Sequence, residues 1–221
     1  MKLFLNERQT EVFDLVCEKL GRPNVYLVGG FVRNTMLGKT TSDIDFAVKN
    51  DPQSVYKAFP YGHYFEKYGT ISFSLSDYRI TITSLRKESG YKDSRHPDSV
   101  TFVKDINIDY KRRDFTVNAL YADSDLVIRD PSGRGFKDLQ RKRLTLIGNA
   151  NKRLREDPLR IVRAFRFKYE LGMEFSRSLQ RAVDKNIPLI SKLNPDKVRE
   201  EMNKCPENAR DEIARRIRFQ L

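Results

Sequence analysis

The stretch from residue 25 to residue 48 constrains the fold of this chain more than any other part. An apolar run ends in Gly29-Gly30, a short helix-like segment carrying Arg33 follows, and Asp43 and Asp45 then alternate on a second apolar run. In a strand, residues i and i+2 point to the same face of the sheet. The stretch therefore predicts two strands joined through a glycine turn, with both carboxylates at the mouth of that turn.

Two carboxylates beside a glycine turn are typical of a divalent metal held next to a phosphate. Backbone N–H groups at Gly29-Gly30 can approach a triphosphate, with Arg33 as a charge-assisted donor, although the glycine pair alone is equally compatible with a plain turn. Carboxylates are rare on a short apolar strand, which favours a metal pair at Asp43 and Asp45 over a solvated strand face. Two oxygen ligands suit Mg²⁺, because this ion keeps several waters and takes further ligands from phosphates.

The charge of the chain points to a polyanionic partner. The 221 residues carry a formal net charge of +12, and residues 134–221 contain 23 Lys and Arg but only 12 Asp and Glu. Such a balance favours RNA or DNA over a membrane surface, with the binding surface mostly in the C-terminal part. Cys17 and Cys205 lack the spacing of a zinc site or a disulfide framework. No stretch approaches the length of a spanning helix, so we expect a soluble cytoplasmic protein without membrane contact.

Hydrophobic periodicity divides the chain near residue 145. Asn6 is expected to cap a helix that ends at Leu20. The strands are predicted at 25–28, 44–48, 70–75, 79–85, 119–122 and 127–129, with a polar loop over 86–98. From Asn149 onward helical periodicity dominates and no strand is expected; helices are predicted at 149–155, 158–171, 176–186, 195–203 and 207–219. We predict an α+β fold: residues 1–145 form a mixed, mainly antiparallel sheet with helices on one side, and residues 146–221 form a helical region.

A second dense cluster of charge is Arg112-Arg113-Asp114. One interpretation is a carboxylate that accepts a hydrogen bond from a ribose hydroxyl, beside an arginine on phosphate or base. The alternative is a basic turn that binds a polyanion without chemistry.

A third cluster lies on the predicted helix at 158–171. Pro158 suits the first turn of that helix, with Asp157 as its cap. Arg160, Arg163 and Arg166 recur every three residues, so they can line one groove. A carboxylate and a guanidinium have fixed donor and acceptor patterns that can read the edge of a base. A solvated basic face is the alternative.

Together these motifs resemble the class II tRNA nucleotidyltransferases, a family that includes the CCA-adding enzymes and the bacterial poly(A) polymerases. The resemblance runs from about Val25 to Met202. The matching motifs are Gly29-Gly30-Phe31-Val32-Arg33 with Asp43-Ile44-Asp45, Arg112-Arg113-Asp114-Phe115-Thr116-Val117-Asn118-Ala119, and Glu156-Asp157 followed by Arg160, Arg163 and Arg166-Phe167. The likeness also includes the loop at 91–97 and the segment at 130–139.

The resemblance implies a role for each of the motif residues. Asp43 and Asp45 would be catalytic and would hold Mg²⁺. The nucleotide-binding residues would be Gly29, Gly30, Arg33, Arg113, Asp114, Asn118, Glu156, Asp157, Arg160, Arg163 and Arg166. Among these, Asp157 and Arg160 would pair with CTP or ATP, Glu156 would orient Arg160, and Arg113 and Asp114 would hold phosphate and ribose. The loop near 87–97 would be the family's flexible loop, implicated in the switch from C to A addition.

Three features depart from the family pattern. Asn34 stands where the family usually has an Asp after the motif arginine, and Thr81 stands where a third acidic residue is usual. The chain also stops at Leu221, after the neck, so we expect the family's body and tail helices to be absent, either in a minimal enzyme or in a fragment.

The leading hypothesis is template-independent addition of C and A, from CTP and ATP, to the 3′ end of tRNA, with release of pyrophosphate. An enzyme that adds only A, or a poly(A) polymerase, is the alternative. A catalytically silent RNA-binding protein is a more remote one, motivated by Asn34, Thr81 and the short chain. The oligomeric state is left open by the sequence.

Overall fold

The computed structural model describes residues 1–90 and 97–217, which form two compact units. The first unit comprises Met1–Glu88, Val100–Arg113 and Val117–Gly135. Of the described residues, the second unit comprises 89–90, 97–99, 114–116 and 136–217. This division follows spatial contacts, whereas the boundary expected near residue 145 follows sequence periodicity and stays a prediction.

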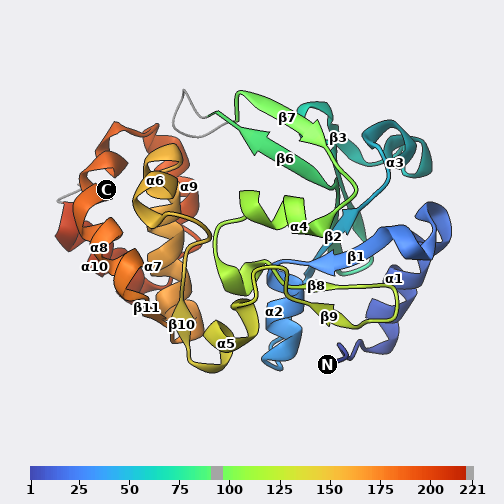
Figure 1. Ribbon diagram of the computed structural model, residues 1–221, viewed down its shortest axis with the longest axis horizontal. Coiled ribbons are helices and arrows are strands. Elements are labelled where there is room, and N and C mark those ends of the chain that lie inside the picture. The colour runs from blue at the N-terminus through green and yellow to red at the C-terminus, as the bar shows by residue number, and fades with distance from the viewer. Residues whose placement is uncertain (91–96, 218–221) are drawn as a thin grey trace. The chain divides into compact units, whose positions relative to one another are not determined.

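The first unit is built on a seven-stranded sheet (Figure 1). Its strand order is β3-β4-β5-β2-β1-β8-β9, where the strands are β1 (Val25–Val28), β2 (Asp43–Val48), β3 (His63–Phe65), β4 (Thr70–Leu75), β5 (Tyr78–Ser84), β8 (Tyr121–Ala122) and β9 (Ile128–Arg129). β2 and β5 run parallel, and the other neighbouring pairs are antiparallel. The predicted mixed, mainly antiparallel sheet is therefore confirmed.

One face of this sheet is covered by α1 (Glu7–Leu20) and α3 (Pro52–Ala58). α1 begins with the predicted capping box, in which Asn6 and Gln9 each accept a hydrogen bond from the other's backbone N–H. Phe13 of α1 stacks on Phe46 of β2, with 6.4 Å between ring centroids. Because Phe46 alternates with Asp45, the aspartates point to the opposite face.

The opposite face carries a second core. Val28, Ala47, Leu85 and Tyr121 form a buried cluster there, and apolar side chains that include Ile106 of α4 (Ile106–Asp109) and Tyr110 of η3 (Tyr110–Arg112) pack against it. The prediction of helices on one side only is therefore wrong. A four-residue helix is too short for hydrophobic periodicity to reveal it.

The polar segment expected to be a loop over 86–98 is partly ordered as strands. β6 (Arg86–Ser89) and β7 (Ser99–Phe102) pair in a two-stranded sheet. The sequence did not reveal β6 because its alternating half-buried and exposed residues are all polar. The remainder of the predicted loop, at 91–96, lies outside the described residues.

The second unit is mainly helical, as predicted. Its helices are α5 (Gly135–Gln140, whose first residue belongs to the first unit), α6 (Ala150–Glu156), α7 (Leu159–Leu171), α8 (Arg177–Asn186), α9 (Pro195–Met202) and α10 (Glu207–Ile217), with the 3₁₀ segment η5 (Ile187–Lys192) between α8 and α9. Two details differ from the prediction. Pro158 precedes α7 instead of lying in its first turn, and β10 (Arg143–Leu144) pairs in parallel with β11 (Glu174–Phe175), so strands do continue beyond Asn149.

The core of the second unit is aromatic along α7. Phe165 contacts Phe175 of β11 edge-on at 5.3 Å between ring centroids, and Phe167 contacts Phe115 in the same way at 5.7 Å. Because residues i and i+2 lie on different sides of a helix, the two rings anchor α7 from two sides. Phe167 lies on the side that also carries Arg163 and Arg166.

Among the described residues, no helix has both the length and the apolar character that crossing a bilayer requires.

Candidate active site

Asp43 and Asp45 lie on one face of β2, as predicted, with buried Ile44 between them on the other face. Asp43 is exposed at the start of the strand, whereas Asp45 is half-buried one pleat further in. A side chain at each of these positions can therefore reach a common ligand above the sheet.

The neighbouring strand β5 decides what stands beside the two aspartates. In the parallel register of β2 and β5, Arg79 lies opposite Asp43 and Thr81 lies opposite Asp45. The position where the family usually has a third acid therefore carries a neutral hydroxyl next to Asp45. Accordingly, the described part of the chain contains no group of three or more His, Cys, Asp or Glu side chains arranged to hold a metal ion.

Gly29 and Arg113 close around Asp45. Gly29 has φ of 74° and ψ of −140°, a backbone conformation essentially reserved for glycine. A Cβ atom at Gly29 would lie 3.3 Å from Asp45 Oδ2 and 3.9 Å from Arg113 Nη1. The glycine is thus required both by the turn and by the close approach of the carboxylate and the guanidinium.

The ionisation of Asp45 is balanced between burial and nearby charges. Burial raises its pKa, the neighbouring Arg113 guanidinium lowers it, and the Asp43 carboxylate raises it again; the net shift is upward. A divalent cation would favour the ionised form of both aspartates. A half-buried carboxylate and an exposed one, with the neutral Thr81 beside them, fit an ion that takes only one or two protein carboxylates and completes its shell with water and phosphate oxygens.

Arg33 of α2 (Gly30–Met36) is 3% exposed and is held by two amide side chains. Its Nη1 donates to Asn118 Oδ1, and its Nε and Nη2 donate to Asn34 Oδ1 at 3.1 and 2.9 Å. Asn34, which replaces the family's usual Asp, therefore still binds the motif arginine but contributes no negative charge at that contact. A Cβ at Gly30 would lie 3.5 Å from Arg33 Nη2, which again brings the glycine turn and the arginine together.

In the second unit, Asp114 and Arg163 form an ion pair. Arg163 Nε and Nη2 donate to Asp114 Oδ2 at 2.9 and 2.5 Å, and Asp114 Oδ1 accepts from the N–H of Phe115 at 2.7 Å. Burial lowers the pKa of Arg163, but Asp114 and Glu201 outweigh it and raise the pKa overall, so the guanidinium stays charged. The predicted ribose-binding Asp114 is thus oriented by the predicted pocket arginine.

Glu201 of α9 was not singled out from the sequence. It is a buried carboxylate whose Oε1 lies 2.9 Å from Arg166 Nη1 and 3.8 Å from Arg163 Nη1. Both arginines also lie over the Phe167 ring, at 5.6 Å for Arg163 and 4.6 Å for Arg166. The available signal was the helical spacing of Val198, Glu201 and Met202, which places Glu201 on the apolar face of α9.

Arg160 is anchored among acids and a backbone carbonyl. The side chain is 6% exposed, and its Nη1 donates to the carbonyl of Arg153 at 2.8 Å. Glu156 Oε2 lies 3.7 Å from Arg160 Nη1, and Asp157 Oδ2 lies 3.7 Å from Arg160 Nε. Asp157 also accepts a hydrogen bond from the N–H of Leu159 at 3.2 Å, so it caps the backbone at the start of α7 from one residue earlier than a regular N-cap.

The arginines at 160, 163 and 166 therefore do not form a plain basic stripe. Acids from other segments lie beside each of them: Glu156 and Asp157 for Arg160, Asp114 for Arg163 and Glu201 for Arg166. Within α7, Glu170 Oε2 also lies 3.9 Å from Arg166 Nε. The partners outside the helix cannot be found from the sequence periodicity of α7.

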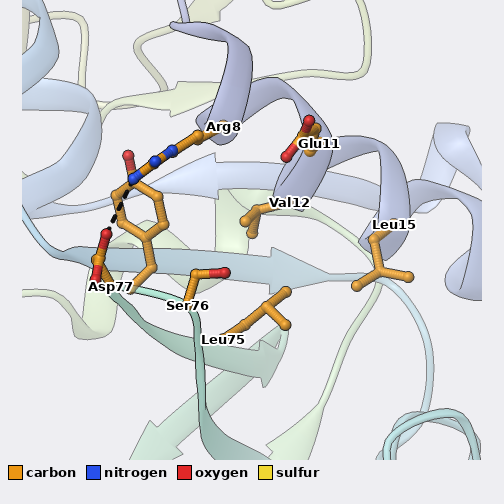
Figure 2. Close-up of a pocket in the computed structure, with 8 residues that line it drawn as sticks. Arg8, Glu11, Val12, Leu15, Leu75, Ser76 and Asp77 are labelled. Carbon is orange, nitrogen blue, oxygen red and sulfur yellow. Dashed lines mark hydrogen bonds and ion pairs between the residues drawn. The ribbon is translucent and has the colours of Figure 1, made fainter.

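An open pocket in the first unit lies apart from these residues. Arg8 and Glu11 of α1 and Asp77 in the β4–β5 turn line it, together with Val12, Leu15, Leu75, Ser76 and Tyr78, and its volume is about 420 Å³ (Figure 2). Arg8 and Asp77 form an exposed ion pair of 3.0 Å there. None of the predicted site residues contributes to this pocket, which lies on the α1 side of the sheet.

Comparison with known proteins gives consistent relatives. The CCA-adding enzyme of Geobacillus kaustophilus (strain HTA426) is 37% identical over 180 residues, covering 81% of this chain and 44% of the relative. The CCA-adding enzyme of Lactobacillus delbrueckii subsp. bulgaricus (strain ATCC 11842) is 38% identical over 205 residues, covering 90% of this chain and 52% of the relative. The chain thus spans about half the length of the curated relatives it matches.

Solved structures agree in fold. The structure of the Bacillus stearothermophilus CCA-adding enzyme in complex with CTP superposes with a TM-score of 0.78 at 32% identity, covering 90% of this chain and 49% of that chain. A Thermotoga maritima CCA-adding enzyme complexed with tRNA has a TM-score of 0.75 at 23% identity, covering 96% of this chain and 52% of that chain, which supports the fold alone.

The family assignment rests on the first part of the chain. A family profile described as the poly A polymerase head domain matches residues 25–145, more than half of the 221 residues. The matched range contains the aspartates of β2, the Gly29 turn and the segment from Arg112 to Asn118. The chain therefore belongs to the poly(A) polymerase head-domain family of class II tRNA nucleotidyltransferases, whose members use divalent metal.

Proposed function

We propose that this protein adds C and A, from CTP and ATP, to the 3′ end of tRNA, and that it releases pyrophosphate. The observation that carries the proposal is the Asp43–Asp45 pair on one face of β2, with Gly29 and Arg113 closing on Asp45. Relatives named CCA-adding enzymes, one of them solved with CTP, support this choice of substrates.

The proposed reaction is an attack of the tRNA 3′-hydroxyl on the α-phosphate of the nucleotide. Mg²⁺, held by Asp43 and Asp45, would supply charge stabilisation and an activated hydroxyl when bound. Arg113 and Arg33 each present a guanidinium in the first unit, and both would neutralise charge on the triphosphate. The glycines at 29 and 30 would let the backbone approach the same phosphates.

In the second unit, the proposal assigns base and sugar recognition to α7 and its neighbours. Asp157 and Arg160 would read the edge of C or A, because a carboxylate accepts and a guanidinium donates in fixed directions. Glu156 would hold Arg160 in the orientation that reading requires. Asp114, Arg163 and Arg166 would bind the ribose and the remaining faces of the nucleotide, with Asn118 supporting Arg33 in the first unit.

In this proposal residues 1–145 are the catalytic head and residues 146–221 the helical neck. A tRNA-processing role would place the protein in the cytoplasm. The basic excess of residues 134–221 supports a phosphate-binding surface there, so we expect tRNA binding to weaken steeply with salt.

The test is Mg²⁺-dependent incorporation of labelled CTP and ATP into tRNA that lacks its CCA end. CTP alone, ATP alone and both together would be compared on tRNAs ending before each position of CCA. Incorporation of C and then A supports the proposal. Folded protein that incorporates neither nucleotide would overturn it.

Exclusive use of ATP would instead identify an enzyme that adds only A, or a poly(A) polymerase. The head-domain match is compatible with that reading because its description names poly A polymerase. A silent RNA-binding protein is favoured by Thr81 beside Asp45 and by the neutral Asn34 beside Arg33. It would bind tRNA but neither CTP nor Mg²⁺.

A further inference from the structure

Asp109, at the end of α4, is a fully buried carboxylate that none of the sequence motifs includes. Its Oδ1 accepts from the N–H of Arg86 at 3.0 Å and from Arg112 Nε at 2.8 Å. Its Oδ2 accepts from the Tyr121 hydroxyl at 2.6 Å and from Arg113 Nε at 3.2 Å. Two guanidiniums, a phenol and a backbone amide thus converge on one carboxylate.

Asp109 stays ionised in this position. Burial alone raises its pKa, but Arg112 and Arg113 lower it more, helped by the hydrogen bonds from Tyr121 and from the Arg86 backbone, so the pKa falls below its usual range. A buried ionised carboxylate is costly unless its partners are fixed in place. The four donors offset this cost, and Asp109 in turn restrains the groups that donate to it.

The consequence for Arg113 is that one edge of its guanidinium is tied down. Arg113 Nε donates to the Tyr121 hydroxyl at 2.8 Å, its Nη2 lies 3.2 Å from Asp109 Oδ2, and the group lies over the Tyr121 ring at 5.0 Å from the centroid. The opposite nitrogen, Nη1, is the one that approaches the Gly29 turn. Two side chains thus select which end of Arg113 faces the turn and Asp45.

We propose that Asp109 and Tyr121 are positioning residues, which hold the Arg113 guanidinium against the Gly29–Asp45 turn so that it meets the triphosphate of the incoming nucleotide. The inference rests on the proposed function. Neither residue touches substrate in this account; both act through Arg113. The competing explanation is that the network only stabilises the fold, in which case its loss would cost stability without changing phosphate affinity.

Tyr121→Phe separates the two explanations best, because it removes the hydroxyl that bridges Asp109 and Arg113 and leaves the ring beneath Arg113. Tyr26→Phe is the matched control: Tyr26 contacts Tyr121 edge-on at 6.1 Å on the same side of the sheet, and its hydroxyl takes no part in the Asp109 network. Asp109→Asn is the second variant, with a larger effect on the network. Thermal melting shows that each variant is folded at the assay temperature.

Affinity for inorganic tripolyphosphate and for CTP, each with Mg²⁺, is measured by calorimetry on the full chain. We expect Tyr121→Phe to weaken both about 5-fold to 20-fold and Asp109→Asn to weaken them at least as much, with Tyr26→Phe unchanged. In an Arg113→Gln background, Tyr121→Phe should add little, because both changes remove the same contact. In CTP incorporation the loss should appear in KM more than in kcat.

The proposal is overturned if folded Tyr121→Phe and Asp109→Asn bind tripolyphosphate as tightly as the parent chain. It is also overturned if the effects of Tyr121→Phe and Arg113→Gln add fully. A parent chain that binds neither tripolyphosphate nor CTP would overturn the proposed function itself, and the inference with it. Binding by the parent without any change in the variants removes only the positioning role.

Discussion

The aspartates of β2 and the arginines of α7 hold their charges in opposite ways. Asp43 is exposed and Asp45 has its pKa raised by burial, with a neutral Thr81 where a third acid would stand. Arg160, Arg163 and Arg166 instead each have a carboxylate within 4 Å. The two aspartates lack a third acid beside them and are proposed to bind a cation, whereas each of the three arginines already has a carboxylate partner.

This difference teaches that the two groups should respond differently to substitution. Removing an aspartate from β2 would take away a proposed metal ligand but few contacts that the fold needs. Removing an arginine from α7 leaves a buried acid or carbonyl without its donor, which costs stability as well as function.

The largest expected effect is a loss of activity when Asp43 of β2 is replaced. Asp43→Ala should lower nucleotide incorporation by roughly 1000-fold or more, because metal-assisted charge stabilisation is lost, with little change in melting temperature. Asp77→Ala is the matched control, since Asp77 forms only an exposed ion pair with Arg8. Incorporation and thermal melting are measured together; an active Asp43→Ala would refute the metal assignment.

In contrast to Asp43→Ala, Arg160→Ala should clearly lower the stability of the protein. Its loss removes the donor to the Arg153 carbonyl and leaves Glu156 and Asp157 less compensated, so we expect about 2–3 kcal/mol of destabilisation in urea unfolding. Arg155→Ala, at an exposed position of α6, should change stability by less than about 0.5 kcal/mol. Equal stability of the two variants would mean that Arg160 is not held as the comparison requires.

Gly29→Ala tests the close approach around Asp45. Its backbone conformation should cost roughly 1–3 kcal/mol, and the added methyl would stand 3.3 Å from the Asp45 carboxylate, so activity should fall about 10-fold beyond any unfolding. Gly38→Ala is the control at a second glycine of positive φ, 66°, where an added methyl group would meet no atom within 4 Å. Similar activity in both variants would show that the steric contact does not matter.

The smallest effect concerns pH and an acid of the second unit, Glu212 on α10. Burial raises its pKa, but the Tyr169 hydroxyl, Lys168 and Arg216 lower it by more, so the folded pKa lies below the unfolded one. Its contribution to stability is then present at neutral pH and is lost as the pH falls below about 4.3, the usual Glu value.

Glu212→Gln should therefore lower the free energy of unfolding at pH 7 by less than about 1 kcal/mol, which appears as a slightly lower melting temperature. Near pH 3 the variant and the parent chain should be equally stable. The melting temperatures of the parent protein and of the Glu212→Gln variant are measured between pH 3 and pH 7. A stability difference between the two proteins that grows as the pH falls would contradict the downward shift of the Glu212 pKa.

The sequence alone determined the local elements and the motif residues. The capping box at Asn6, the glycine turn, the alternation of Asp43 and Asp45 and the five helices after residue 149 each rest on neighbouring residues and a single periodicity. The periodic helices and the alternating strand could be predicted from the sequence because the spacing of apolar residues decides which face of each element is buried.

Only the tertiary structure decided which partner each charged group has. Asp109 takes its donors from four positions between 86 and 121, and Glu201 reaches Arg163 and Arg166 from a different helix. It also decided that Thr81 stands next to Asp45, since that follows from the parallel register of β2 and β5. The physical reason is that ion pairs and strand register join residues distant in the chain, and no local pattern encodes those contacts.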